Sequence, residues 1–395
     1  MSEVSAARPI WPIVLAFGIT QIVGYGTLYY AFAILVPAVA AELEVPPSTL
    51  FGVLSAGLLL GGLVAPRLGR AMDRFGAPRL MVLGSAIVPV LLGLLALTPG
   101  LFGFAILIVL IQIVSVLVLY DAAFASLAQI AGQEARRSIT HLTLIAGFAS
   151  TLFWPLTGWL VSHLDWRQVY ALFALMQLVL VLPLHAWIAR RVGDGRRSTA
   201  GGGSATVTAP PPAPRPRVFW LVALSFALTG TLGSALSIHM VAVLQATGLH
   251  EGAYLAAMLM GPAQVASRLT DALFWRNLHP VIVATIAASA YPLAMLVMLL
   301  APAGLLTAAA FAVLFGVGQG LSSIVKGTVP LALFGAGGYA AMLGRLTRIR
   351  VLLGAGAPFV FAAAVDTVGA KISLGILLAI GIAAILPLVL LRRDR

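Results

Sequence analysis

Three charged side chains stand inside long apolar runs of this 395-residue chain. They are Asp121 in "LYDAAFASL", Arg268 in "QVASRLT" and Lys326 in "IVKGTVPLA". An acid in apolar surroundings can bind a proton or pair with a base, and an arginine can hold a carboxylate through two hydrogen bonds. The sequence therefore predicts a proton site or gate at Asp121 and Lys326, and anion binding at Arg268. Each residue also has a purely structural interpretation. Asp121 could be hydrogen-bonded between helices, and Arg268 and Lys326 could extend their charged ends to the membrane interface.

Other polar candidates lie in the same kind of run. Gln21, Tyr25 and Tyr29 recur every four residues and would form one stripe on a helix. This stripe either lines a cavity with hydroxyl and amide donors or packs against other helices. His239 lies deep in a run and is a candidate for substrate binding, whereas His141 is either a proton relay or an interfacial histidine.

The composition limits the class of protein that could carry these groups. The chain is 61% hydrophobic and 9% charged, with a mean hydropathy of +1.05, so a soluble fold could not hide its apolar surface. It has no cysteine, which excludes disulfides and thiolate metal sites. The net charge of +12 is spread over short loops rather than one face, which argues against nucleic acid as a partner.

Twelve apolar stretches are long enough to cross about 30 Å of hydrocarbon. We therefore expect an all-α membrane protein with 12 transmembrane helices in two pseudo-symmetric six-helix bundles. The predicted spans are 10–39, 48–68, 79–98, 101–130, 138–162, 168–189, 218–245, 252–270, 280–300, 304–333, 344–366 and 371–391.

The loops predict the orientation and the division of the chain. With both termini cytoplasmic, only Arg167 and Lys371 of the 24 Lys and Arg residues lie outside, as the positive-inside rule requires of an inner-membrane protein. The Gly-, Ser- and Pro-rich segment 190–217 reads as a flexible cytoplasmic linker between an N-terminal bundle, 1–189, and a C-terminal bundle, 218–395.

The two halves resemble each other weakly. "VAPRLG" ends span two and "VASRLT" ends span eight, so Arg67 corresponds to Arg268. The same comparison sets Asp121 of span four against Lys326 of span ten. Repeats of this kind are a transporter signature. We expect Asp121 and Lys326 to form an ion pair when the cytoplasmic half of the cavity is closed, and to separate when Asp121 is protonated.

The connection "GRAMDRFGAPR" between spans two and three carries Gly69, Asp73, Arg74, Gly76 and Arg79. The glycines allow a close turn and close helix approach, while the arginines suit a cytoplasmic loop. This pattern, in a twelve-span chain with a central linker, resembles the loop signature of the major facilitator superfamily. The alternative is a basic loop with turn glycines.

The resemblance implies a conformational latch. In that family the aspartate of the motif docks at the start of span eleven, which places Asp73 near Gly344 and Arg345. The contact would hold the cytoplasmic side closed while the outside is open.

A finer resemblance is to monocarboxylate porters and oxalate/formate exchangers. It rests on "YGTLYYAFAILVP" at 25–37, "DWR" at 165–167 and "QVASR" at 264–268. In that group an arginine of span eight pairs with a substrate carboxylate, and Arg268 occupies that position. The porters have an acid one turn earlier, where this chain has Gln264, so that particular proton-coupling pair is missing.

These observations predict gradient-driven transport of a small organic anion of the monocarboxylate type, coupled to protons, by a monomer in the lipid bilayer. H-E-x-x-H, G-x-S-x-G and phosphate-loop motifs do not occur, so we expect no enzyme and no cofactor. One alternative is proton-driven efflux of drug-like or toxic compounds, although span four lacks the arginine usual in such antiporters. A second is a receptor or scaffold that transports nothing.

Overall fold

The computed structural model describes residues 9–200, 216–246 and 252–393, and all of their regular structure is helical. The helices of the N-terminal half are α1 (Trp11–Tyr25), α2 (Ala31–Glu42), α3 (Pro47–Phe75), α4 (Ala77–Leu97), α5 (Leu101–Ser115), α6 (Tyr120–Ile130), α7 (Ala135–Ala146), α8 (Ala149–Val161), α9 (Trp166–Met176) and α10 (Leu182–Ala200). Those of the C-terminal half are α11 (Pro216–Ala246), α12 (Gly252–Met258), α13 (Met260–Leu273), α14 (Pro280–Leu300), α15 (Leu305–Phe334), α16 (Tyr339–Gly354), α17 (Ala357–Val368) and α18 (Ala370–Arg393).

Within the described residues, 11 helical runs are long and apolar enough to cross a membrane. They match eleven of the twelve predicted spans. The remaining one, predicted at 252–270, consists of two shorter helices, α12 and α13, which are interrupted at Leu259. The all-helical membrane fold is thus confirmed.

Several spans are broken near their middle. The first contains a π-helical turn, Gly26–Tyr30, between α1 and α2, and the fourth is interrupted between α5 and α6. The interruption leaves backbone carbonyls without helical partners, and Gln21 binds one of them: its Nε2 donates to Val118 O at 2.8 Å. Asp121 lies in the first turn of α6, where a negative charge is favourable at the positive end of the helix dipole. These breaks place polar groups at the level of the membrane interior.

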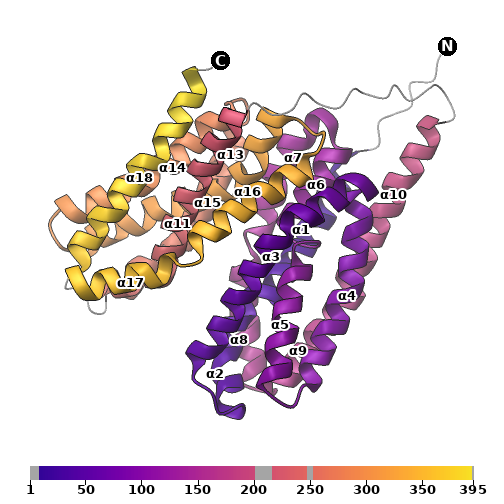
Figure 1. Cartoon of the computed structure of the whole chain (residues 1–395), viewed down its shortest axis with the longest axis horizontal. Coiled ribbons are helices and arrows are strands. Elements are labelled where there is room, and N and C mark those ends of the chain that lie inside the picture. The colour runs from indigo at the N-terminus through magenta and orange to yellow at the C-terminus, as the bar shows by residue number, and fades with distance from the viewer. Residues whose placement is uncertain (1–8, 201–215, 247–251, 394–395) are drawn as a thin grey trace.

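The two halves meet at one end of the molecule and diverge at the other (Figure 1). They meet where α1 begins and α18 ends, which we call the closed end. There α3, α6 and α7 pack against α13, α15 and α16. At the opposite, splayed end, α2, α5 and α8 lie apart from α17. Of the buried apolar clusters in the described part of the chain, the one that crosses between the halves lies near the closed end, where Tyr339, Ala340 and Leu343 of α16 join residues of α1, α4, α6 and α7.

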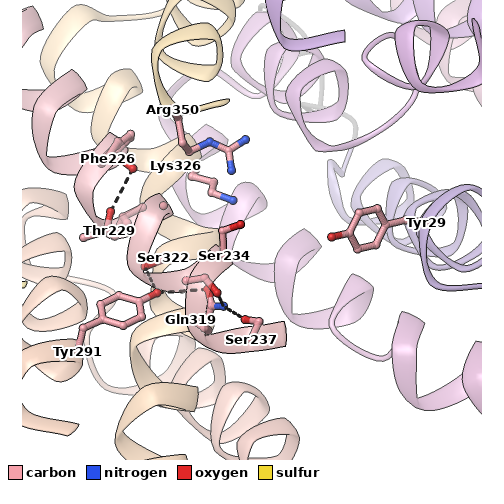
Figure 2. Close-up of a pocket in the computed structure, with 13 residues that line it drawn as sticks. Tyr29, Phe226, Thr229, Ser234, Ser237, Tyr291, Gln319, Ser322, Lys326 and Arg350 are labelled. Carbon is pink, nitrogen blue, oxygen red and sulfur yellow. Dashed lines mark hydrogen bonds between the residues drawn. The ribbon is translucent and has the colours of Figure 1, made fainter. Parts of the chain in front are cut away.

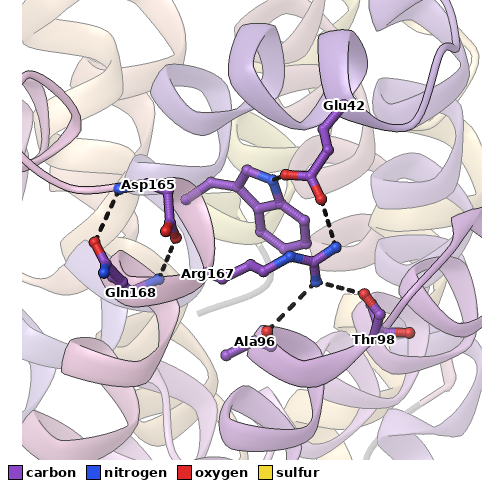
Figure 3. A network of polar contacts seen from close by, with 7 residues as sticks. Glu42, Ala96, Thr98, Asp165, Arg167 and Gln168 are labelled. Carbon is purple, nitrogen blue, oxygen red and sulfur yellow. Dashed lines mark hydrogen bonds and ion pairs between the residues drawn. The ribbon is translucent and has the colours of Figure 1, made fainter.

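At the splayed end, a polar network joins three helices of the N-terminal half (Figure 3). Arg167 at the start of α9 donates to Glu42 Oε1 at 2.6 Å and to the carbonyl oxygen of Thr98 at 2.5 Å. The Trp166 indole donates to Glu42 Oε2 at 2.5 Å. The network therefore ties the end of α2 and the end of α4 to α9, and we call it the Arg167 clamp.

Two predicted boundaries are wrong. The segment 69–79 is not a loop, because α3 continues to Phe75 and only Gly76 separates it from α4. Gly76 has φ +93°, a conformation that favours glycine, and it ends α3 without a longer turn. The predicted linker begins as helix, since α10 extends to Ala200, and most of its remainder lies outside the described residues.

Candidate functional site

The closed end is held by a close crossing of α3 and α16. A Cβ atom on Gly69 would overlap the backbone of Ala340, and one on Gly344 would overlap the backbone of Ala65. Because neither neighbour is a movable side chain, the two helices can approach this closely only with glycine at these positions. The crossing is therefore a backbone-to-backbone contact between the two halves.

Asp73 lies at this crossing and binds the amino end of α16. Its Oδ1 and Oδ2 accept hydrogen bonds from the backbone N–H groups of Ala340 and Ala341, at 3.1 and 2.8 Å. The first N–H groups of a helix have no partner within the helix, and a carboxylate is stabilised by the helix dipole there. The contact lies one turn before the predicted neighbours Gly344 and Arg345, because α16 begins at Tyr339 and not at 344.

The other predicted latch residues lie around this contact. Arg74, Arg79 and Arg345 have exposed side chains, and Arg74 packs its guanidinium over the ring of Phe75 at 5.1 Å. Gly76 makes the turn between α3 and α4. Of the charged members of the predicted set, Asp73 is the one that hydrogen-bonds across the interface.

A second contact joins α13 to α7. Asp271 Oδ2 accepts a hydrogen bond from the Thr140 hydroxyl at 3.2 Å, whereas its Oδ1 is buried without a partner. Arg268 donates weakly, at 3.4 Å, to the carbonyl oxygens of Thr143 on α7 and Gly320 on α15. Arg268 is therefore buried between the halves, directed at backbone carbonyls of both.

A cavity of about 310 Å³ lies between the halves, and most of its wall belongs to the C-terminal half (Figure 2). Tyr29 is the lining residue from the N-terminal half. The polar lining residues from the other half are Thr229, Ser234, Ser237, Tyr291, Gln319, Ser322, Lys326 and Arg350. Concave sites of this size bind small molecules in many proteins.

Part of the polar wall is already hydrogen-bonded. Gln319 donates from Nε2 to Ser237 Oγ at 2.7 Å, and its Oε1 accepts from the Tyr291 hydroxyl at 3.2 Å. The Tyr291 oxygen also lies 3.3 Å from Ser322 Oγ. This network fixes the orientation of the Gln319 amide. Ser234, in contrast, makes no side-chain hydrogen bond within the described part of the chain.

Two cations face the cavity. Figure 2 shows the Lys326 and Arg350 side chains next to each other, with the Tyr29 hydroxyl directed into the cavity from the opposite wall, roughly toward Ser234. Neither cation forms a hydrogen bond or ion pair with any residue in 9–200, 216–246 or 252–393. The cavity therefore has an end with a net positive charge, since the nearby carboxylate of Asp121 can offset at most one of the two cations.

Asp121 reaches the same region from α6. It lines a small void of about 10 Å³ together with Lys326, Thr347 and Arg350. The expected Asp121–Lys326 ion pair is not formed, although the closed end is closed. Instead Asp121 Oδ2 accepts a hydrogen bond from the Thr347 hydroxyl at 2.9 Å, which links α6 to α16. The prediction of a direct pair is therefore wrong for this structure, in which the carboxylate is held across the interface by a hydroxyl of α16.

The predicted stripe of Gln21, Tyr25 and Tyr29 is interrupted by the π-helical turn. The extra residue in that turn brings Tyr30, not Tyr29, to the ring of Tyr25, at a centroid distance of 6.3 Å. Tyr25 also packs on Tyr120 at 4.7 Å. Gln21 is buried against Val118, so only Tyr29 of the three lines the cavity.

Three further predicted residues lie away from the cavity wall. The side chain of Gln264 is partly buried on α13 beside the Arg268 turn. His239 Nε2 lies 3.1 Å from the carbonyl oxygen of Pro358, and the His239 ring packs on Phe361. His141 makes an edge contact with Trp11 at 5.4 Å. None of them is brought together with Lys326 and Arg350.

The sequence analysis missed most of the cavity wall, although a periodic signal was readable. The cavity-lining residues of α11 are Phe226, Thr229, Gly230, Gly233, Ser234 and Ser237; after Phe226 all are small or polar, and they lie on one face of the helix at spacings of three and four residues. A Cβ on Gly230 would come within 2.8 Å of Arg350 Cγ, and one on Gly233 within 3.0 Å of Gln319 Oε1. The small residues thus make room for the two long polar side chains.

The arrangement is suited to binding rather than to chemistry. The described residues contain no group of three or more His, Asp or Glu side chains placed to hold a metal ion. Two helical bundles around a central polar cavity, closed at one end and diverging at the other, are the arrangement expected of a membrane transporter.

Comparison with known proteins agrees. The chain matches the family model of the Major Facilitator Superfamily over residues 17–347, and it belongs to that family. No curated protein sequence matches it.

Solved structures share the fold. The human organic anion transporter MFSD10 (TETRAN) superposes with a TM-score of 0.73 at 17% sequence identity, covering 96% of this chain and 98% of that one. The proton:xylose symporter XylE, bound to 6-bromo-6-deoxy-D-glucose, has a TM-score of 0.69 at 14% identity, with 95% and 94% covered. These likenesses show the fold; it is the family match that makes the chain a membrane transporter rather than an enzyme.

Proposed function

We propose that the protein moves a small organic anion across the inner membrane by alternating access, coupled to protons, and that it works as a monomer. The observation that carries this proposal is the pair of cations, Lys326 and Arg350, which face the cavity without a hydrogen bond or ion pair to any described residue. The likeness to an organic anion transporter shows the fold alone, so the proposal depends on the cavity.

Charge within a membrane protein is costly unless it is paired or solvated. Two adjacent cations at the closed end of one cavity raise the electrostatic potential there. A bound anion would lower the free-energy cost of placing each cation inside the membrane protein. The planar guanidinium of Arg350 can make two charge-assisted hydrogen bonds to a carboxylate, while Lys326 adds a compact positive charge. Arg268, buried nearby between the halves, adds to the positive potential and remains a second candidate for contact with the anion.

Alternating access would require the closed end to open. The inside-positive rule favours a cytoplasmic closed end, because Arg70, Arg74 and Arg79 are clustered there and both termini would then be cytoplasmic. In that orientation the structure represents the state open to the outside. Opening inward then separates α3 from α16, α13 from α7 and α6 from α16. The Asp73 contacts are broken in that step, which makes Asp73 a latch.

Asp121 is the proposed site of proton coupling. Its carboxylate faces the two cations and is held by Thr347 across the interface. Protonation would remove its attraction for Lys326 and Arg350. The cations would then be free to hold the substrate anion while α6 leaves α16.

A flux assay in liposomes tests the proposal. Purified protein should catalyse counterflow of organic anions but not of neutral sugars, and Arg350→Gln and Lys326→Gln should each weaken anion binding about tenfold or more. Arg348→Gln, an exposed position on the same helix, is the matched control. Anion flux that is unaffected by both cavity variants would overturn the proposal.

A further inference from the structure

We infer that the substrate is a polyhydroxylated carboxylate, of the sugar-acid class, bound with its carboxylate toward the closed end and its hydroxyl-bearing body toward the splayed end. The inference rests on the proposed function, since it assumes that Lys326 and Arg350 bind the anionic group. It adds what the rest of the ligand must be and how it lies.

The cavity wall changes in character along its axis. On α15, Lys326 lies toward the closed end and Gln319 toward the splayed end, with a rise of about 10 Å between them. On α11, Gly230 abuts Arg350, and Ser237 lies about 10 Å further along, beside Gln319. Charge is thus confined to one end of the wall, and uncharged polar groups form the other. A ligand that matches this wall carries its charge at one end only.

The uncharged part of the wall offers hydrogen-bond donors that no described residue uses. Ser234 makes no side-chain hydrogen bond, and the Ser237 oxygen accepts from Gln319, which leaves its own hydroxyl proton free. The Tyr29 hydroxyl points into the cavity from the opposite half (Figure 2) and has no hydrogen-bond partner among the described residues. These groups come from both halves. A body with several hydroxyl groups could bind all three at once.

An apolar body would fit this wall poorly. It would displace water from Ser234, Ser237 and Tyr29 without replacing the hydrogen bonds, and a buried polar group left without a partner is penalised strongly. A neutral polyol would bind the uncharged wall but leave Lys326 and Arg350 with only the one carboxylate of Asp121 between them. The wall therefore selects for the combination of one anionic end and a hydroxylated body.

The probes are three small molecules of similar length: D-gluconate, hexanoate and D-glucose. Binding to the purified full chain would be measured as a ligand-dependent shift in thermal stability, and as competition for gluconate flux in liposomes. Gluconate should bind at least about tenfold more tightly than hexanoate, and glucose should bind more weakly than gluconate by a similar factor.

Variants separate this inference from the proposed function. In the double variant Ser234→Ala/Ser237→Ala, the preference for gluconate over hexanoate should fall about tenfold or more, whereas in Thr231→Ala, a position on α11 that does not line the cavity, it should not change. Arg350→Gln should weaken both anions together, because it removes the shared carboxylate contact.

Each outcome has a definite meaning. If hexanoate binds as tightly as gluconate and both depend on Arg350, the site is an anion site with an apolar body, so this inference fails and the proposed function stands. If glucose binds as well as gluconate, or if neither anion depends on Arg350 and Lys326, the proposed function fails as well. If none of the three probes binds, the inference is overturned, and the counterflow assay with other anions still tests the proposed function.

Discussion

The two contacts that hold the closed end together are related by the predicted internal repeat, yet they are built differently. Between α3 and α16, Gly69 and Gly344 bring backbone against backbone, and both oxygens of Asp73 are bound. Between α7 and α13, the contact is made by side chains, and one oxygen of Asp271 is buried without a partner. The first contact cannot adjust to a larger side chain, while the second leaves one oxygen of Asp271 without a hydrogen bond, although the positive charge of Arg136 on α7 attracts the carboxylate. We expect α3–α16 to determine how firmly the end closes and α7–α13 to oppose full closure.

The largest effect should come from filling the α3–α16 crossing. A leucine in Gly344→Leu would overlap the backbone of Ala65, and a clash with backbone cannot be relieved by a change of rotamer. We expect the closed-end population to fall by about a hundredfold and transport to fall with it. Because the chain has no cysteine, spin labels can be attached at introduced cysteines replacing exposed Phe102 and Ile372, near the splayed end, and their separation measured.

Gly375→Leu on α18 is the control for this substitution, because no atom lies within 4 Å of a Cβ at that position. A distance distribution for Gly344→Leu equal to that of the control would show that the crossing does not limit closure.

The next effect concerns the charge at this crossing. Asp73→Asn keeps the size of the side chain but loses the interaction of the carboxylate with the amino end of α16, which is worth about 1–2 kcal/mol. Turnover in liposomes should slow about tenfold, while substrate binding to the purified protein should change much less. Asp366→Asn, exposed on α17, provides the comparison. Equal losses of binding and turnover would contradict a purely conformational role for Asp73.

The α7–α13 contact should respond with the opposite sign. Asp271→Asn removes a buried charge with an unpartnered oxygen and keeps a carbonyl to accept from Thr140, so the closed end should become more populated, by about threefold. The same spin-label distances measure this shift. A shift toward the open state, as for Asp73→Asn, would mean that the two contacts act alike.

The smallest effect should come from the arginines of the predicted latch. Arg74, Arg79 and Arg345 are exposed, and single surface charges contribute about 0–1 kcal/mol. Their replacement by glutamine, one at a time, should change the closed-end population by no more than about threefold. A tenfold loss of transport in any of these variants would show that the replaced arginine does help to hold the closed end closed.

Hydropathy and the positive-inside rule predicted the class of fold, since these depend only on the order of residues along the chain. They failed where a helix runs past its apolar segment. Span two was predicted to end at 68, yet α3 reaches Phe75 because only Gly76 interrupts it. Asp271 was missed for the same reason, as it lies one residue beyond the predicted end of span eight.

The binding wall was harder to predict. Arg350 was not among the predicted site residues, because its place close behind Arg345 and Arg348 does not distinguish it in the sequence from a basic helix end. In the structure α16 begins at Tyr339, and Arg350 lies about 16 Å along it. The partner of Asp121 could not be predicted at all, because the choice between Lys326 and Thr347 depends on how α16 is rotated against α6. Such a rotation is determined by packing between residues distant in sequence.

The Arg167 clamp has a mechanical consequence. By joining α2, α4 and α9 at the splayed end, it ties the ends of these helices to one another, so we expect the three to move together when the two halves change their relative tilt. A helix as long as α3 measures about 44 Å, and a tilt of about 10° at its pivot displaces its far end by about 8 Å. A small movement at the α3–α16 crossing, which breaks only a few hydrogen bonds, is thereby amplified at the other end of the helix. The resulting change in the width of the cavity entrance is large enough to admit or exclude a small molecule.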